Sequence, residues 1–302
     1  NGDLAPDIYV SNDFYERDYL YINQQDGTFK EQIKDQMEHL SLASMGTDMA
    51  DINNDGYPEI FATEMLPESD YRRKTTTMFE NYNIYYLKLK RDFYHQYMQN
   101  TLQLNNGDGS FSEIAHFSGV SATDWSWGAL MFDADNDGLR DIFVCNGVFQ
   151  DVTDQDFINF FADEVVQKMV LTGEKEAVEK IIAKMPSNPI PNKFFKNKGD
   201  LTFEDASEAF GFATPTFSNG AAYGDLDNDG DLDLVVNNLN QPAHIYRNKT
   251  SETLNHHFLK VALKGSTDNP FAVGAKILLY QEKSIKSVEV IPSRGFQSSV
   301  ES

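Results

Sequence analysis

The feature that most constrains this chain is a nine-residue acidic loop that recurs with equal internal spacing. The copy Asp225-Leu-Asp-Asn-Asp-Gly-Asp-Leu-Asp233 has aspartates at positions 1, 3, 5 and 9 and Gly230 at position 6, where a sharp turn favours a residue without a side chain. Carboxylates crowded into one turn repel one another, and Ca²⁺ is the usual counter-charge because it accepts many oxygen ligands. The loop therefore predicts a calcium site.

Two further complete copies are Asp133-Ala-Asp-Asn-Asp-Gly-Leu-Arg-Asp141 and Asp51-Ile-Asn-Asn-Asp-Gly-Tyr-Pro-Glu59. None continues to the glutamate that an EF-hand has at its twelfth position, and each leads into a β-rich triplet instead of a helix. The alternative is a set of Asx-rich turns without metal. Because the same four positions carry carboxylate or amide groups in every copy, calcium is favoured.

A fourth copy is cut by the start of the sequence, where Asn1, Asp3 and Asp7 fill positions 3, 5 and 9. Leu4 stands where the other copies have glycine, so this site is left open. The sequence begins inside a loop, and we expect it to be a fragment. We therefore predict about three calcium ions per chain, with a fourth at the truncated loop as the open case.

A second phrase recurs in register with the loops: a short apolar run, an asparagine, a turn and an aromatic residue. The copies are Leu20–Phe29, Leu102–Phe111 and Phe194–Phe203. Asp-Gly between apolar runs predicts a hairpin. Each unit is then a small antiparallel sheet of about 50 residues, which is the size of one β-propeller blade. The triplets that follow the loops are expected strands: Ile8–Val10, Ile60–Ala62, Ile142–Val144 and Leu234–Val236.

The wider intervals between the later loops leave room for two insertions, at about 67–100 and 148–192. The first mixes tyrosines with lysines and arginines, and Met78–Met98 is expected to be helical. It either packs on its sheet or forms a binding rim, since tyrosine and arginine favour recognition surfaces. The second has apolar residues at helical spacing and predicts a helical hairpin, either docked or facing a partner.

After about residue 250 the repeat gives way to alternating short runs that predict strands of a separate β-module over 251–302. The expected strands are Phe258–Leu263, Val273–Tyr280 and Ser287–Ile291. The fold class is therefore all-β: a partial propeller of about four units over 1–250, with two helical insertions and a partial C-terminal β-module.

The composition of the chain excludes several classes of partner. The formal net charge of −22 argues against nucleic acid or an anionic membrane surface as a partner. Cys145 is the only cysteine, so no disulfide within the chain is possible, and we expect it to be buried in the core. The sequence has no apolar run long enough to span a membrane.

The three loops and in-register hairpins resemble FG-GAP/VCBS repeats, the calcium-binding blades of integrin-α-like β-propellers. The segment Asn269-Pro-Phe-Ala-Val-Gly-Ala-Lys-Ile, with Arg294-Gly-Phe-Gln-Ser298, is similar to the start of the ASPIC/UnbV module of the cartilage acidic protein family. That module typically continues to a His-Phe-Gly-Leu-Gly type ending, which this sequence lacks.

The resemblance implies a secreted or cell-surface protein that forms a seven-bladed propeller when complete. It also implies the calcium ligands, including a backbone carbonyl at position 7 of each loop: Asp51, Asn53, Asp55, Tyr57 and Glu59; Asp133, Asp135, Asp137, Leu139 and Asp141; Asp225, Asp227, Asp229, Asp231 and Asp233. Glu59 replaces the usual aspartate, which should weaken or distort its site.

Two function classes follow from the sequence. The favoured one is an extracellular calcium-dependent binding or adhesion scaffold for a protein or glycan, without catalysis. The alternative is a calcium-dependent polysaccharide lyase or hydrolase, which would need a carboxylate, tyrosine or histidine constellation in one cleft. The sequence has no HExxH, GxSxG or phosphate-loop signature. Asp124 beside Trp125 and Trp127 suggests a sugar subsite, but Trp127 precedes Gly128 of the repeat, and core packing is the favoured interpretation.

Overall fold

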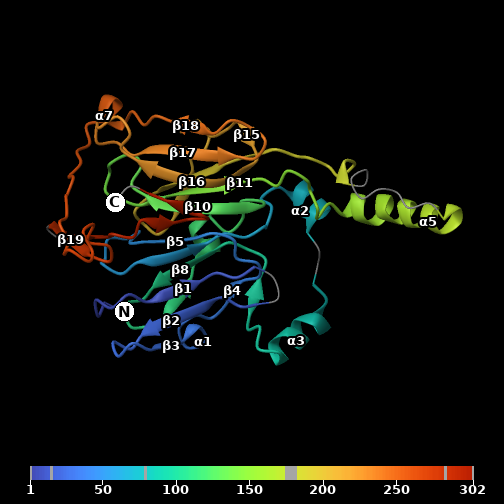
Figure 1. The fold of residues 1–302 in the computed structure, drawn as a ribbon, viewed down its shortest axis with the longest axis horizontal. Helices are drawn as coiled ribbons and strands as arrows, with labels where there is room; N and C mark the ends of the chain where they lie inside the picture. Colours follow the sequence, from blue (N-terminus) through green and yellow to red (C-terminus); the bar gives the residue numbers. More distant parts are fainter. Residues whose placement is uncertain (1, 14–15, 78–79, 174–181, 282–283, 301–302) are drawn as a thin grey trace.

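The computed structural model describes residues 2–13, 16–77, 80–173, 182–281 and 284–300 (Figure 1). Its body consists of antiparallel sheets that follow one another along the chain, as the all-β prediction requires. The strands of the four main sheets are β1 (Ile8–Val10), β2 (Tyr19–Asn23) and β3 (Phe29–Glu31); β5 (Thr47–Ala50), β6 (Glu59–Ala62), β8 (Thr101–Asn105) and β9 (Phe111–Glu113); β10 (Ser126–Phe132), β11 (Asp141–Asn146), β13 (Lys193–Asn197) and β14 (Phe203–Asp205); β16 (Ser218–Gly224), β17 (Asp233–Asn238) and β18 (His244–Tyr246).

Each complete acidic loop joins the first two strands of a sheet. The register pairs Ala50 with Glu59 across β5 and β6, and Gly224 with Asp233 across β16 and β17. Position 9 of the loop is therefore the first residue of the second strand. The four predicted triplets after the loops are confirmed as strands.

The predicted hairpins are also present, joining β2 to β3, β8 to β9 and β13 to β14. In each, the asparagine that ends the first strand accepts a hydrogen bond from the N–H two residues ahead. The bonds reach Asn23 from Gln25 at 2.9 Å, Asn105 from Gly107 at 3.0 Å and Asn197 from Gly199 at 2.8 Å. Such Asx turns explain why asparagine recurs at the strand end.

The core lies between successive sheets. Phe61, Leu102 and Met131 belong to the cluster between the second and third sheets, while Phe143 and Val236 belong to the cluster between the third and fourth. The first strands β5, β10 and β16 lie next to one another. Cys145 is fully buried in the second cluster, as predicted, and burial raises the pKa of its thiol.

The helices of the two insertions leave the sheets at one end, on the right in Figure 1. They are α2 (Asp70–Thr76) and α3 (Tyr82–Lys90) in the first insertion, and η1 (Phe157–Phe161) and α5 (Ala162–Thr172) in the second. The helix expected over Met78–Met98 is shorter, because the chain turns after α3 and β7 (Gln96–Tyr97) pairs with β4 (Leu40–Ser41). The second helix of the predicted hairpin falls largely on 174–181, outside the described residues.

The remaining elements are short: α1 (Ile33–Gln36), α4 (Ala115–Ser118), α7 (Thr250–Thr253), β12 (Ile190–Pro191) and β15 (Pro215–Thr216). The C-terminal region forms two separate hairpins, β19 (Lys276–Gln281) with β20 (Ser284–Glu289) and β21 (Ser293–Arg294) with β22 (Ser298–Ser299). The expected strand Phe258–Leu263 is wrong. This segment has no strand assignment and no ladder partner among the described strands, and its side chains are exposed.

Candidate metal centres

Two of the predicted loops bring three carboxylates together. Oxygen atoms of Asp133, Asp135 and Asp137 lie within 4.8 Å of one another, and Asp225, Asp227 and Asp229 form a second group on the same terms. These are positions 1, 3 and 5 of their loops. A convergent set of hard oxygen donors of this kind suits Ca²⁺.

Hydrogen bonds from the loop's own backbone hold the first carboxylate in place. Asp133 accepts from Asp137 N–H at 3.1 Å and from Gly138 N–H at 2.9 Å, and Asp51 accepts from Asp55 and Gly56 at 3.1 and 2.9 Å. The position-6 glycines have φ near +90°, a conformation that favours glycine. The sequence therefore folds the turn so that its carboxylates point inward.

The loop Asp51–Glu59 has an amide at position 3, where Asn53 Nδ2 donates to Asp55 Oδ2 at 2.9 Å. Its Glu59 is fully buried, and Oε1 has no hydrogen-bond partner among the residues that the structure describes. Burial raises the pKa of Glu59 to about 8, a shift that the hydrogen bond from Ile52 N–H opposes and the charges of Asp55 and Asp51 increase. The orphaned buried oxygen of Glu59 suits a cation, but Asp51, Asp55 and Glu59 are not among the groups of described carboxylates that converge within 4.8 Å.

The position-9 carboxylates lie outside the two groups of three and join the loop to the neighbouring strand. Asp141 accepts from Ala134 N–H at 3.2 Å and from Asn197 N–H at 2.9 Å. Asp233 makes the equivalent bonds with Leu226 and Asn248 at 3.1 and 2.8 Å. The carboxylate at position 9 therefore links the loop to the neighbouring strand by hydrogen bonds, in addition to its predicted role as a ligand.

Burial raises the pKa of Asp141 to about 7. The hydrogen bonds from Asn197 and Ala134 oppose this shift, and the charges of Asp135 and Asp137 add to it.

A positive side chain from a neighbouring strand faces the loop carboxylates. Lys196 contacts Asp135 and lies 3.7 Å from Asp137. These ammonium contacts show that the cluster attracts positive charge.

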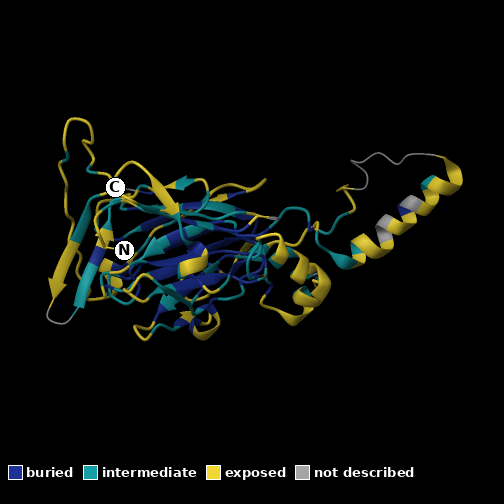
Figure 2. Ribbon diagram, turned by 90° about the horizontal axis from the view of Figure 1, so that it is seen from below, coloured by how far each residue is buried: buried dark blue, intermediate teal, exposed yellow. Residues whose placement is uncertain are grey.

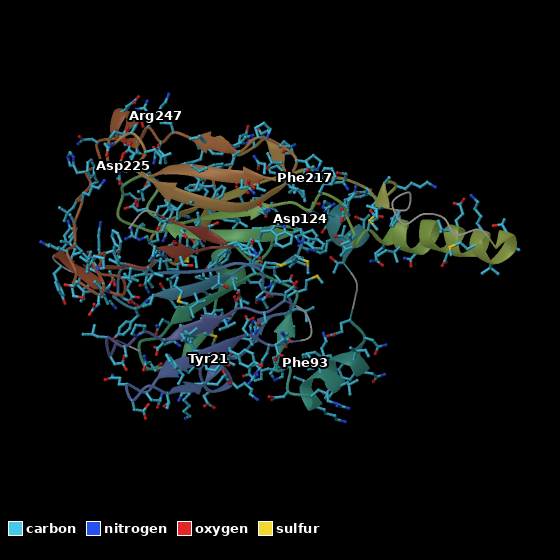
Figure 3. All side chains as sticks on the ribbon, in the orientation of Figure 1. Tyr21, Phe93, Asp124, Phe217, Asp225 and Arg247 are labelled. Atoms are coloured by element: carbon cyan, nitrogen blue, oxygen red, sulfur yellow. The ribbon has the colours of Figure 1, made fainter. Side chains whose placement is uncertain are left out.

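The last loop has the same kind of neighbour. Arg247 Nε lies 2.7 Å from Asp227 Oδ2, and its Nη2 lies 3.3 Å from Asp229 Oδ2. Figure 3 shows Asp225 and Arg247 at the end of the sheets opposite Asp124 and Phe217. The acidic loops and the helical insertions therefore lie at opposite ends of the strands.

Position 4 is a feature that the sequence analysis missed. Asn54, Asn136 and Asn228 have left-handed φ of 58°, 56° and 62°. Asn54 Nδ2 donates to Gly138 O at 3.1 Å, and Asn136 Nδ2 donates to Asp231 Oδ1 at 2.9 Å, so each of these loops contacts the next. The signal was the invariant asparagine within the three copies, since asparagine tolerates this conformation.

The truncated first loop shows less. Asn1 lies outside the described residues. Asp7 accepts a hydrogen bond from Asn23 N–H at 2.9 Å, as Asp141 does from Asn197 and Asp233 does from Asn248. Asp3 is exposed and accepts from Ala5 N–H at 2.9 Å and from Gln25 Nε2 at 3.1 Å.

The two tryptophans lie at the opposite end. Trp127 is half-buried, its Nε1 donates to Gly147 O at 2.8 Å, and its ring centroid lies 5.3 Å from that of Phe296. Asp124, which suggested a sugar subsite, accepts from Arg72 Nε at 2.7 Å and Nη2 at 2.9 Å. Trp127 and Asp124 are therefore held by protein contacts, whereas the buried Nε1 of Trp125 has no hydrogen-bond partner among the described residues.

The repeated sheets and acidic loops define a class of protein. An FG-GAP-like repeat matches residues 1–62, 93–144 and 181–236, together more than half of the chain, and the chain belongs to this family. The gaps between the matches contain most of both helical insertions.

Among individual proteins, the chain is similar to cartilage acidic protein 1 of Xenopus tropicalis, with 28% identity over 224 residues, covering 64% of this chain and 33% of that protein. It is also similar to cartilage acidic protein 1 of Homo sapiens, with 40% identity over 57 residues, covering 18% of this chain and 9% of that protein. The chain thus spans about a third or less of these relatives. None of its described helices is long and apolar enough to cross a membrane.

Proposed function

We propose that the chain is part of an extracellular β-propeller that binds Ca²⁺ in its acidic loops and acts as a binding or adhesion scaffold, without catalysing a reaction. The observation that carries the proposal is the convergence of three carboxylates in each of two loops at the same end of neighbouring sheets. The propeller arrangement is supported by the adjacent first strands β5, β10 and β16 and by the cores between successive sheets.

The side chains at positions 1, 3 and 5 would hold the ion, with the position-7 carbonyl as a further ligand. Bound Ca²⁺ supplies the positive charge that offsets carboxylate repulsion in the turn. Extracellular calcium modules bind at about 10⁻⁴–10⁻³ M, so each site adds only about 1 kcal/mol at millimolar calcium. Several sites together stabilise the end of the sheets where the loops contact one another.

We assign the partner-binding surface to the insertions, because they extend from the end of the strands opposite the calcium loops. A protein or glycan is the proposed partner. The C-terminal region from 251 onward is proposed to be an ASPIC/UnbV-like module. The perturbed carboxyls Glu59 and Asp141 are held by backbone N–H groups in structural positions, which supports binding over catalysis.

Isothermal titration of the chain with CaCl₂ tests the calcium proposal. The paired variants D51N/D55N, D133N/D137N and D225N/D229N should each lose one site. The control D108N/D200N changes two exposed hairpin aspartates that cap Ser110 and Thr202, and it should keep every site. Unchanged calcium stoichiometry in the loop variants would overturn the assignment.

A separate screen addresses the partner. Binding of the calcium-loaded chain to protein and glycan arrays, compared with the same chain in EDTA, should show calcium-dependent partners. Incubation with acidic polysaccharides should leave their chain length unchanged. Depolymerisation that a single substitution in the chain abolishes would contradict the scaffold proposal.

A further inference from the structure

The two insertions carry helices of opposite charge at the same end of the molecule. None of the nine side chains of α3 is buried. The stretch from Tyr82 to Arg91 contains Lys88, Lys90 and Arg91 and is flanked by Glu80 and Asp92, in a chain whose net charge is −22. Lys88 pairs with Glu80 of the same insertion, whereas Lys90 and Arg91 are exposed. An acidic partner surface would be repelled by most of this acidic protein and attracted to the basic, exposed helix.

The exposed side chains of α3 are also large and partly apolar. Tyr82, Tyr86 and Lys90 follow one another at four-residue spacing and form one row on the helix. The rings of Tyr82 and Tyr86 lie 4.7 Å apart, edge to face, and Tyr82 is 70% exposed. Leu87 is 50% exposed and precedes Arg91 by four residues in the adjacent row. Tyrosine and arginine with aliphatic neighbours are typical of protein interfaces.

The second insertion supplies the complementary surface. From Asp154 to Thr172, the end of α5, it contains one lysine, Lys168, and four acidic residues: Asp154, Asp156, Asp163 and Glu164. Its apolar residues Phe160, Val170 and Leu171 are 74%, 78% and 84% exposed. Figures 1 and 2 both show α5 projecting from the sheets, and in Figure 2 most of its described residues have the colour of exposed residues.

Large apolar side chains on a projecting helix mark an interaction site, because leaving them in water is unfavourable. Within one copy α3 and α5 lie apart, in both views. Each helix nevertheless presents what the other requires: apolar side chains with carboxylates on α5, and tyrosines with ammonium and guanidinium groups on α3. One pairing would therefore cover the exposed apolar side chains of both helices.

We propose that two copies of this chain associate by exchange, with η1 and α5 of each copy packed on α3 of the other. Such an arrangement has two-fold symmetry, and its two contacts are identical. The inference goes beyond the calcium scaffold, because neither helix contributes a residue to a metal loop. Calcium titration and association are therefore separate readouts.

Sedimentation velocity of the 302-residue chain at up to about 100 µM, a range in which micromolar contacts populate a dimer, tests the proposal. The basic-helix variant K88E/K90E/R91E gives α3 the charge of α5. The acidic-helix variant D156K/D163K/E164K does the reverse. Each variant alone should sediment as a monomer, since both of its contacts become repulsive.

An equimolar mixture of the two variants should recover the dimer, because every contact in the mixed pair again joins opposite charges. The recovery also shows that both variants are folded. The control K30E/K249E/K264E makes the same charge change at exposed lysines elsewhere and should stay dimeric. A monomeric wild-type chain, dimers of either variant alone, or a mixture that stays monomeric would overturn the proposal.

Discussion

Arg294 Nη1 lies 2.8 Å from Asp48 Oδ1, and this contact joins the hairpin of β21 and β22 to strand β5. The same guanidinium nitrogen donates to Met49 O at 2.8 Å, and Gly295 pairs with Thr47 in a β-bridge. Both charged side chains are largely buried. The C-terminal hairpin is therefore fixed to the sheets by a buried ion pair.

The variant R294M should destabilise the chain by about 3–5 kcal/mol, because Asp48 would remain buried without its counter-charge. Adding D48N should recover part of that loss, giving a coupling energy of roughly 1–3 kcal/mol between the two positions. Urea unfolding of the wild type, both single variants and the double variant measures this energy. Additive effects would show that the ion pair does not hold the hairpin.

A second prediction concerns Glu64, whose position in its sheet is occupied by asparagine in the next two. Ser126 Oγ donates to Asn146 Oδ1 at 2.8 Å, and Ser218 Oγ donates to Asn238 Oδ1 at 2.7 Å. Glu64 is fully buried, and its Oε1 has no hydrogen-bond partner within the described part of the chain. The carboxyl therefore replaces an amide that is hydrogen-bonded in the other units.

The hydroxyl that would serve Glu64 is engaged elsewhere, since Ser44 Oγ donates to Asp18 Oδ2 at 2.9 Å. Burial raises the pKa of Glu64 from 4.5 to about 8, with a hydrogen bond from Met65 N–H opposing the shift and the charge of Asp13 adding to it. The folded chain thus retains a proton that the unfolded chain has lost. The free energy of unfolding should fall as pH rises from about 4.5 to about 8 and then level off.

The variant E64Q should remove the part of this dependence that Glu64 contributes, while Glu59 and Asp141 keep theirs. It should stabilise the chain by about 1–3 kcal/mol at pH 8 and change stability little at pH 4.5, where the folded carboxyl is protonated and only about half of the unfolded chains have lost the proton. Denaturant unfolding at both pH values measures the difference. The control E208Q changes an exposed glutamate and should have no pH-dependent effect. Equal effects of E64Q at the two pH values would refute the explanation.

A third prediction concerns Arg72, which ties both insertions to the sheets. Its Nη1 lies 2.6 Å from Asp151 Oδ2, and its Nε lies 2.7 Å from Asp124 Oδ2. The variant R72M leaves two buried carboxylates without a partner and should cost about 3–5 kcal/mol. It should also speed proteolysis in the segment around α2 and α3.

The matched control is R73A, because Arg73 is exposed and, among the described residues, its guanidinium donates to the backbone carbonyls of Pro67 and Glu68. This change should cost less than about 1 kcal/mol. Thermal melts and timed trypsin digestion of the three proteins give both readouts. Equal proteolysis of wild type and R72M would show that the insertion is held by other contacts.

A fourth prediction concerns Lys196, whose ammonium contacts the carboxylates of Asp135 and Asp137. A cation entering this loop must displace or repel the ammonium group, so K196Q should tighten calcium binding there by roughly 5- to 10-fold at low salt. The control K198Q removes the same charge from an exposed position two residues away and should change affinity less than 2-fold, as is typical of a screened surface charge. Weaker binding in K196Q would contradict the proposed site.

Sequence patterns predicted the local structure of the repeats well. The strand β1 occupies Ile8–Val10 as expected, and the loops turn at the predicted glycines. These features depend on neighbouring residues, so periodicity and turn chemistry suffice. The convergence of positions 1, 3 and 5 followed from spacing within one loop.

Contacts between distant residues were not predictable in the same way. Arg72 meets Asp151 although they are 79 residues apart, and Arg294 meets Asp48 across 246 residues. Phe258–Leu263 has the composition of a strand, but a strand also needs a partner for its backbone, and none lies beside it among the described strands. The two ion pairs and the missing strand therefore depend on tertiary contacts that local sequence patterns do not encode.

The central claim is that the acidic loops bind calcium and thereby stabilise the sheets. The most direct test is a thermal melt of the chain in about 2 mM CaCl₂ and in EDTA, with calcium counted by elemental analysis of the same dialysed sample. The account predicts about three ions per chain and a melting temperature several degrees higher with calcium. A chain that retains no calcium and melts at the same temperature in both buffers would contradict it.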